Sequence, residues 1–284
     1  MPDSAPAPLR PLTHGTAEVA FRQRDGASRL AHLYQHDPLK VLFPAVPAGE
    51  PPWAVLVTTS GGLVGGDRLD IRARVGEGAG ALVPTQAAEK VYRSLGPDCR
   101  LTVDLAVEPG GALEWLPQET ILFDRARLRR TTRAELAGDA RLMAGEVLVF
   151  GRTAMGERFG TGLARDAWEI RRDGRLVWAD ALHLDGDCAA VLADPAGFGG
   201  AVSVGTVLCA GPGAAELLEP ARDLLDAMPA GAVRAGATLV EGILIVRWLA
   251  EDARALRTAY GGFWAELRAR FLGRPARLPR LWHV

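Results

Sequence analysis

Two carboxylates, Glu146 and Asp180, occupy strand positions where the surrounding pattern is apolar. Side chains alternate between the two faces of a strand, and the segment Ala140–Phe150 predicts a strand. The face that carries Glu146 also carries Leu142, Ala144, Leu148 and Phe150. In Arg175–Leu184, the face that carries Asp180 also carries Leu176, Trp178, Leu182 and Leu184. Because an unpaired polar group in an apolar interior costs several kcal/mol, each carboxylate needs a partner or internal water.

Two interpretations of these carboxylates remain open from periodicity alone. Each could form a buried pair with one of the many arginines of the chain. Alternatively, Glu146 and Asp180 could line a hydrated interior passage that carries a cation.

A glycine-rich stretch, Thr58–Asp67, is the most distinctive motif. A phosphate-binding loop requires a glycine-rich turn that leads into a helix, whereas this stretch leads into the strand-like segment Leu69–Val75. We therefore expect a strained crossing between strands, with Asp67 capping the turn. Ser60 has no His or Asp at a motif distance typical of a serine hydrolase.

The histidines and cysteines do not indicate a metal cage. The five histidines form no HxH or HExxH motif. The run His183–Cys188 offers nitrogen, oxygen and sulfur ligands, but its Asp-Gly-Asp centre is also typical of an ordinary turn. The three cysteines are odd in number and far apart, which fits a reducing cytoplasm rather than a disulfide framework.

Charge and hydropathy exclude two classes of partner. The formal net charge is −1, so no global field favours a nucleic acid or an anionic membrane. The most apolar stretches, Leu142–Phe150 and Leu239–Ala250, contain charged residues and fall short of the ~20 residues of a membrane helix. The arginines at the C-terminal end predict a solvated or partner-facing edge.

Short β-prone runs with turn signals about every ten residues predict a mainly β fold. Asp25-Gly26 and Asp173-Gly174 predict tight hairpins, because both dipeptides favour positive φ. Residues 1–15 are expected to form a loose N-terminal tail, and residues 16–284 a single domain.

Helical periodicity appears only near the C-terminus. One apolar stripe comprises Leu217, Leu218, Ala221, Leu224, Leu225 and Met228. A second helix is expected to begin at Asp252, with an apolar face of Leu256, Tyr260, Phe263, Trp264, Leu267 and Phe271. Between them, Ala237–Leu249 predicts one or two buried strands.

Five segments resemble the family of the urease accessory protein UreD, called UreH in some bacteria, and they occur in family order. The motif residues are Gly61, Gly62, Gly65, Gly66, Asp67, Lys90, Tyr92, Arg93, Ser94, Glu114, Gln118, Glu119, Arg152 and Glu157, followed by the closing segment Leu278–Trp282. The resemblance implies a helically wound, layered β-strand fold with a small helix-containing C-terminal part. It also implies that the chain is not an enzyme.

The resemblance further implies a cytoplasmic scaffold that joins UreF and the GTPase UreG on the urease apoprotein while nickel is delivered. The family is proposed to contain a water-filled tunnel, and Glu146 and Asp180 match its acidic positions. Nickel would be in transit there, with no permanently bound cofactor, because oxygen ligands along a wet channel release a divalent ion readily. Ala87 and Ala88 precede Glu89, which leaves Glu89 as an additional candidate.

One alternative from another class is a small β-fold hydrolase. In that case Glu146 and Asp180 would be an acid/base pair on either side of a substrate cleft. No nucleophile motif accompanies them.

Overall fold

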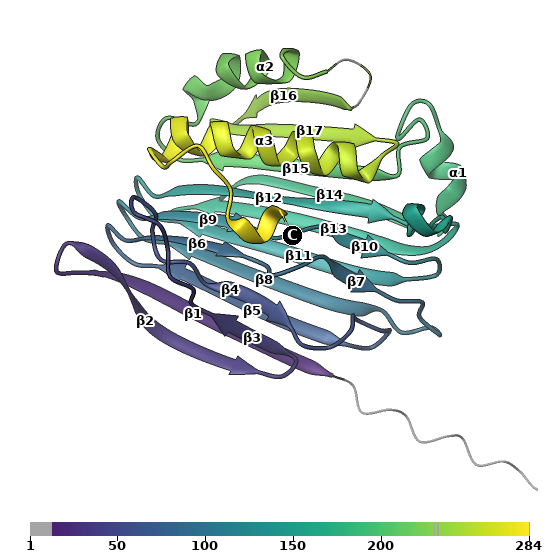
Figure 1. Cartoon of the computed structure of the whole chain (residues 1–284), viewed down its shortest axis with the longest axis horizontal. Coiled ribbons are helices and arrows are strands. Elements are labelled where there is room, and N and C mark those ends of the chain that lie inside the picture. Colours follow the sequence, from purple (N-terminus) through teal and green to yellow (C-terminus); the bar gives the residue numbers. More distant parts are fainter. Residues whose placement is uncertain (1–12, 230, 232, 284) are drawn as a thin grey trace, which may run out of the picture.

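The computed structural model describes residues 13–229, 231 and 233–283, whose strands form two large sheets stacked face to face (Figure 1). Within these residues, the seven-stranded sheet has the order β14 (Arg175–Asp187), β13 (Thr161–Arg172), β11 (Arg127–Leu136), β8 (Cys99–Val107), β5 (Arg68–Val75), β1 (His14–Arg24) and β2 (Ala27–His36). A small sheet pairs β3 (Leu39–Leu42) with β4 (Val55–Thr58).

The second large sheet has eight strands within the described residues. Its main path is β16 (Arg234–Val240), β17 (Ile243–Ala250), β15 (Ser203–Ala210), β12 (Arg141–Phe150), β10 (Thr120–Leu122) and β7 (Glu89–Val91). Strand β9 (Ala112–Leu116) pairs with β12 and with β6 (Gly80–Pro84). The helices are α1 (Cys188–Ala193), α2 (Leu218–Asp226) and α3 (Ala253–Leu272), with 3-10 turns at Thr153–Met155, Ala215–Leu217 and Arg280–His283.

The chain winds between the two sheets as a succession of coils. Strands β5, β8, β11 and β13 are parallel neighbours in one sheet, and the intervening strands β6, β7, β9, β10 and β12 lie in the other. Each coil therefore adds one strand to the seven-stranded sheet and one or two strands to the eight-stranded sheet. The helically wound, layered β fold with a small helical C-terminal part is confirmed.

Both predicted hairpins are present. Strands β1 and β2 turn at Asp25-Gly26, and β13 and β14 turn at Asp173-Gly174; all four residues have positive φ. The first strand begins at His14, so His14 and Gly15 are in β1 rather than in the expected tail; residues 1–12 of that tail lie outside the described residues.

The C-terminal elements follow the periodicity closely. The stripe from Leu217 becomes a 3-10 turn and α2, and Asp252 caps α3 by accepting a hydrogen bond from the Arg254 amide. The predicted strand pair is β16 and β17, but β16 is largely exposed. Helix α1 was not predicted, and it begins where the Asp187 carboxylate accepts from the Ala190 amide.

Two apolar cores lie on opposite sides of the eight-stranded sheet. One fills the space between the sheets, and the other lies between the eight-stranded sheet and α3, which crosses β12, β15 and β17. Strand β12 is consequently buried on both faces. Arg268 of α3 was among the C-terminal arginines expected at a solvated or partner-facing edge, and for this residue the expectation is wrong. It is buried between Glu50 and Glu114 and ties the helix to the sheet.

Gly145 is required by the close approach of α3 to β12. A Cβ at this position would overlap the Tyr260 hydroxyl and the Thr206 carbonyl oxygen. At Gly236 on β16, by contrast, an added Cβ would meet nothing within 4 Å.

We expect Gly145→Ala to lower the free energy of unfolding by about 1–3 kcal/mol or more, because the added methyl overpacks a filled interface. Gly236→Ala, the matched control on an exposed strand, should change it by about 0.5 kcal/mol or less. Urea denaturation of both variants measures the difference. Equal stabilities of the two variants would contradict this close packing of α3.

Candidate functional site

Glu146 lies near the middle of β12 and points into the space between the two sheets. Its predicted face is confirmed, because Leu142, Ala144, Leu148 and Phe150 are all in the core between the sheets. Across the eight-stranded sheet, Glu146 pairs in register with Thr206, which pairs with Arg247. Glu146 is therefore one end of a polar row that runs toward β17.

Arg130 of β11 and Asp166 of β13 meet Glu146 from the opposite sheet. Arg130 donates from Nε to Asp166 Oδ1 at 2.8 Å and from Nη2 to Asp166 Oδ2 at 2.5 Å. The same Nη2 lies 2.6 Å from Glu146 Oε2, and Trp168 Nε1 donates to Glu146 Oε1 at 2.6 Å. We call Arg130, Glu146 and Asp166 the ion triad; all three side chains are buried.

The two carboxylates of the ion triad have opposite pKa shifts. Burial raises the pKa of Glu146 well above its ordinary value of 4.5; the charge of Arg130 counteracts this in part, and Asp166 raises the pKa further. Burial also acts to raise the pKa of Asp166, but the charge and hydrogen bonds of Arg130 outweigh it and lower that pKa below 3.8. Asp166 is therefore the stable counter-ion of Arg130, and Glu146 holds its proton more tightly than a free carboxyl group does.

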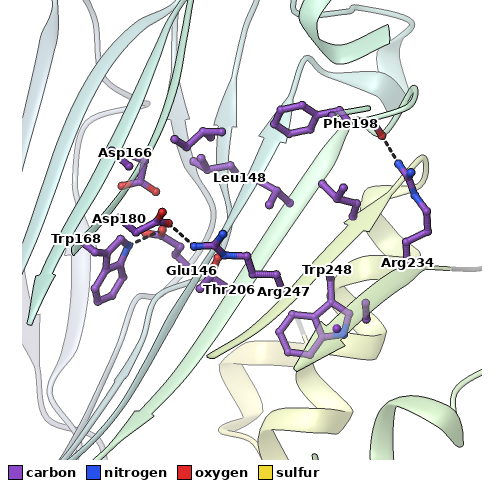
Figure 2. A pocket seen from close by; sticks show the side chains of 17 residues that line it. Glu146, Leu148, Asp166, Trp168, Asp180, Phe198, Thr206, Arg234, Arg247 and Trp248 are labelled. Carbon is purple, nitrogen blue, oxygen red and sulfur yellow. Dashed lines mark hydrogen bonds and ion pairs between the residues drawn. The ribbon is translucent and has the colours of Figure 1, made fainter. Parts of the chain in front are cut away.

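Asp180 lies at the edge of the same space, where β14 faces β17. It pairs in register with Trp168 and forms an ion pair with Arg247, so that this pair joins the two sheets. Trp178, Leu182 and Leu184 of the predicted apolar face pack into the core, whereas Leu176 is exposed and the Asp180 side chain is 39% exposed. Figure 2 shows Asp180 beside the Glu146–Trp168 contact, with Arg247 reaching toward it.

Two cavities meet at Glu146. The Asp180 cavity, about 490 Å³, is lined by Glu146, Asp166, Trp168, Asp180, Arg234, Arg247 and eleven further residues (Figure 2). The Glu89 cavity, about 230 Å³, extends toward the glycine-rich segment and is lined by Ser60, Gly61, Glu89, Thr120, Arg130, Glu146 and others. Because Glu146 lines both, the ion triad separates the two cavities.

The carboxylate of Glu89 lines the Glu89 cavity, and its neighbours Ala87 and Ala88 line the same cavity. Burial raises its pKa, although hydrogen bonds from the Thr58 hydroxyl, at 2.5 Å, and from backbone counteract this. Carboxylates thus occur in the Glu89 cavity, at the junction and in the Asp180 cavity.

The glycine-rich motif crosses the segment that carries Lys90, Tyr92, Arg93 and Ser94. The Leu63 amide donates to the Lys90 carbonyl oxygen at 2.7 Å, and the Tyr92 hydroxyl donates to the Gly61 carbonyl oxygen at 2.6 Å. Arg93 forms a β-bridge with Ala126. Gly62 and Gly66 have positive φ, Gly65 packs directly against Ser94, and Asp67 accepts from the Val64 amide, as the predicted turn requires. These motif residues hold neighbouring coils together.

Four other motif residues fix the C-terminal helix and its following segment. Glu114 binds Arg268; Glu119 forms an ion pair with Arg257; and Gln118 Nε2 donates to the Leu281 carbonyl oxygen at 2.8 Å. Trp282 stacks on Tyr260 with ring centroids 5.7 Å apart. Of the remaining motif residues, Arg152 pairs with Glu157 at 2.7 Å.

Other candidate sites do not form ligand clusters. Asp187 is the cap of α1, and Cys188 is buried with its Sγ 3.7 Å from the Gly162 carbonyl oxygen. Among the residues that the structure describes, no group of three or more His, Cys, Asp or Glu side chains is arranged to hold a metal ion. None of the helices in residues 13–229 and 233–283 combines the length and apolar character needed to cross a bilayer.

Arg130 and Asp166 were missed by the sequence reasoning. The signal was the one that identified Glu146: Arg130 alternates with Leu128, Thr132 and Ala134 on β11. Asp166 alternates with Ala164, Trp168 and Ile170.

Comparison with known proteins identifies one family. The family described as UreD urease accessory protein matches residues 13–283. A protein named urease accessory protein UreD from Magnetococcus marinus is 53% identical over 272 residues, which cover 95% of this chain and 94% of that protein. Urease accessory protein UreD 2 of Methylorubrum populi is 44% identical over 281 residues, covering 98% and 92%. Urease accessory protein UreD 3 of a Bradyrhizobium species is 41% identical over 285 residues, covering 99% and 98%.

The opposite pKa shifts predict opposite pH profiles for two isosteric variants. Above pH 4.5 the folded wild type holds the Glu146 proton more tightly than the unfolded chain, so Glu146 costs stability as the pH rises. Glu146→Gln should therefore gain stability relative to wild type from pH 5 to pH 8. Urea denaturation across that range measures the gain, and a flat or falling difference would contradict the shift.

Asp166→Asn is the matched control with the opposite sign. In the wild type, the ionised Asp166 carboxylate stabilises the fold above its ordinary pKa of 3.8. This stabilisation is lost as the pH falls through the lower pKa that Asp166 has in the folded state. We expect this variant to lose about 3–5 kcal/mol near neutral pH, because it leaves Arg130 short of its counter-ion. The loss should shrink on acidification below pH 3.8.

Proposed function

Because the chain belongs to the UreD urease accessory protein family, we propose that it is a scaffold that joins UreF and UreG on apo-urease and carries nickel between its sheets. A member of this family takes part in urease maturation and is an accessory protein rather than a catalyst. The chain would work in the cytoplasm, where its three free, buried cysteines stay reduced.

The observation that carries the nickel part of the proposal is the meeting of two cavities at a carboxylate. Glu89, Glu146 and Asp180 offer oxygen ligands at successive places, one or two at a time. Carboxylate oxygens hold a hydrated nickel ion less tightly than imidazole or thiolate ligands would, and their small number keeps the affinity low. An ion that must leave again needs sites of this kind.

Exposed apolar residues at one edge of the fold support the scaffold part. Strand β2 is the outermost strand of the seven-stranded sheet and exposes Leu30, Leu33 and Tyr34 by 40–50%. Leu42 and Phe43, at the end of β3 and just after it, are exposed to a similar extent. Apolar side chains on an exposed edge strand are typical of surfaces that a partner covers.

The hydrolase alternative is not retained. Family membership identifies an accessory protein. In addition, Glu146 forms an ion pair with Arg130, and Asp180 forms one with Arg247. The two carboxylates therefore do not flank a substrate cleft as an acid/base pair.

We expect Glu146→Ala together with Asp180→Ala to lower the nickel content of urease several-fold, because two of the successive oxygen sites are lost. The measurement is nickel per urease active site after co-expression of the urease subunits with all accessory proteins. Glu169→Ala is the matched control, since Glu169 lies on the same strand as Trp168 but outside both cavities. Co-purification of the variant with its partners shows that the scaffold is intact.

Omitting the whole chain separates the two parts of the proposal. Nickel-poor urease without the chain, restored when the chain returns, supports the maturation role. Normal nickel loading by the double variant would rule out passage through these cavities and leave the scaffold. Normal loading without the chain would rule out both.

A further inference from the structure

The Arg130 guanidinium occupies the junction of the two cavities, between carboxylates that come from opposite sheets. Its Nη2 lies 2.6 Å from Glu146 Oε2 and 2.5 Å from Asp166 Oδ2. The Thr120 hydroxyl lies 3.2 Å from Nη1 on the Glu89 cavity side. One nitrogen thus has the position that a cation shared by both carboxylates would have.

A second buried arginine shows what a purely structural cluster looks like in this chain. Arg268 also lies between two carboxylates, Glu50 and Glu114, and its remaining hydrogen bonds go to the carbonyl oxygens of Pro275 and Arg277. Arg268 lines neither the Asp180 cavity nor the Glu89 cavity. Arg130 differs because its neighbourhood is reached by a cavity from each side.

We propose that Arg130 is a built-in substitute for a divalent cation at this junction, which prevents Glu146 and Asp166 from retaining nickel. The inference rests on the proposed passage of nickel between the sheets. A divalent ion at the junction must compete with a cation that is covalently attached to β11 and cannot diffuse away. The competition lowers the affinity of the junction and lets the ion move on.

The chemistry of the junction without Arg130 supports this assignment. Two carboxylates and the nearby hydroxyls of Thr120 and Thr206 are the oxygen ligands that divalent cations prefer. The Glu146 and Asp166 carboxylates lie next to each other in the protein interior, where like charges repel strongly. A cation between them removes this repulsion and is therefore attracted strongly. With Arg130 in place, Asp166 is already neutralised and Glu146 shares the same guanidinium.

The test is nickel retention by the full-length chain, expressed with the other accessory proteins that keep it soluble. Arg130→Met removes the charge with little change in volume. After incubation with nickel chloride and gel filtration, we expect about one nickel ion per chain in Arg130→Met above the wild-type value. Metal analysis of the protein peak gives the number, and unchanged retention in the folded variant would overturn the proposal.

Three matched variants separate a substitute cation from a structural ion pair. Arg130→Lys keeps a positive charge at the junction and should retain no more nickel than wild type. Arg130→Met with Glu146→Gln removes one ligand and should lose the retained ion. Arg268→Met leaves two buried carboxylates, Glu50 and Glu114, that line neither the Asp180 cavity nor the Glu89 cavity. This variant should retain no additional nickel. Equal retention by Arg130→Met and Arg268→Met would overturn the assignment to the junction.

Failure of Arg130→Met to fold would also be informative. An ion that binds only the folded state stabilises it in proportion to the logarithm of its concentration. Nickel should then restore folding and raise the Tm of Arg130→Met, but not of Arg268→Met. Absence of rescue by nickel would overturn the proposal.

The outcome is distinguishable from failure of the proposed function, since retention is measured on this chain and not on urease. If Arg130→Met gains no nickel while the double variant of Glu146 and Asp180 lowers the nickel content of urease, only this inference fails. If Arg130→Met retains nickel and the double variant loads urease normally, the junction binds nickel as inferred and the proposed passage fails.

Discussion

The ion triad sets the main physical constraint on the space between the sheets. Separating three ionisable groups from water is costly, and their mutual attraction offsets the cost only when the geometry is close and the hydrogen bonds are satisfied. Arg130 and Asp166 achieve this as register neighbours on two parallel strands, with Glu146 reaching across from the other sheet. A slip of one residue would turn Arg130 toward the outer face, so the triad also specifies the register of β11 against β13.

The polar row needs only one side chain from each strand that it crosses. The coils supply β11, β12 and β13, and the antiparallel strands β14, β15 and β17 extend the row. In the seven-stranded sheet, Thr132, Trp168 and Asp180 follow one another in register; in the eight-stranded sheet, Glu146, Thr206 and Arg247 do so. The surrounding positions remain apolar and supply the core. A polar route can therefore cross a β fold without dividing its core.

Alternation and turn chemistry predicted much of the fold, because both are local properties. The Asp-Gly hairpins, the cap at Asp252 and the apolar face around Glu146 depend on neighbours within a few residues. Which arginine pairs with which carboxylate was not predictable, since 31 of the 33 basic residues are arginines and pairing depends on contacts between sheets. Asp180 is partly exposed although Trp178 and Leu184 on its face are buried, because β14 is an edge strand with a single neighbour in its sheet. The helical winding of the strands was predicted from the family resemblance, not from periodicity.

The two buried arginines show that the same chemical cluster can have different consequences in different places. Around Arg268, backbone carbonyl oxygens complete the shell, and the cluster fastens α3 to the sheet. Around Arg130, a threonine hydroxyl, a tryptophan and two cavities complete it. The Arg268 cluster lines neither cavity of the junction, so its role is to stabilise the packing of α3. An ion pair that cavities reach from both sides can exchange its cation.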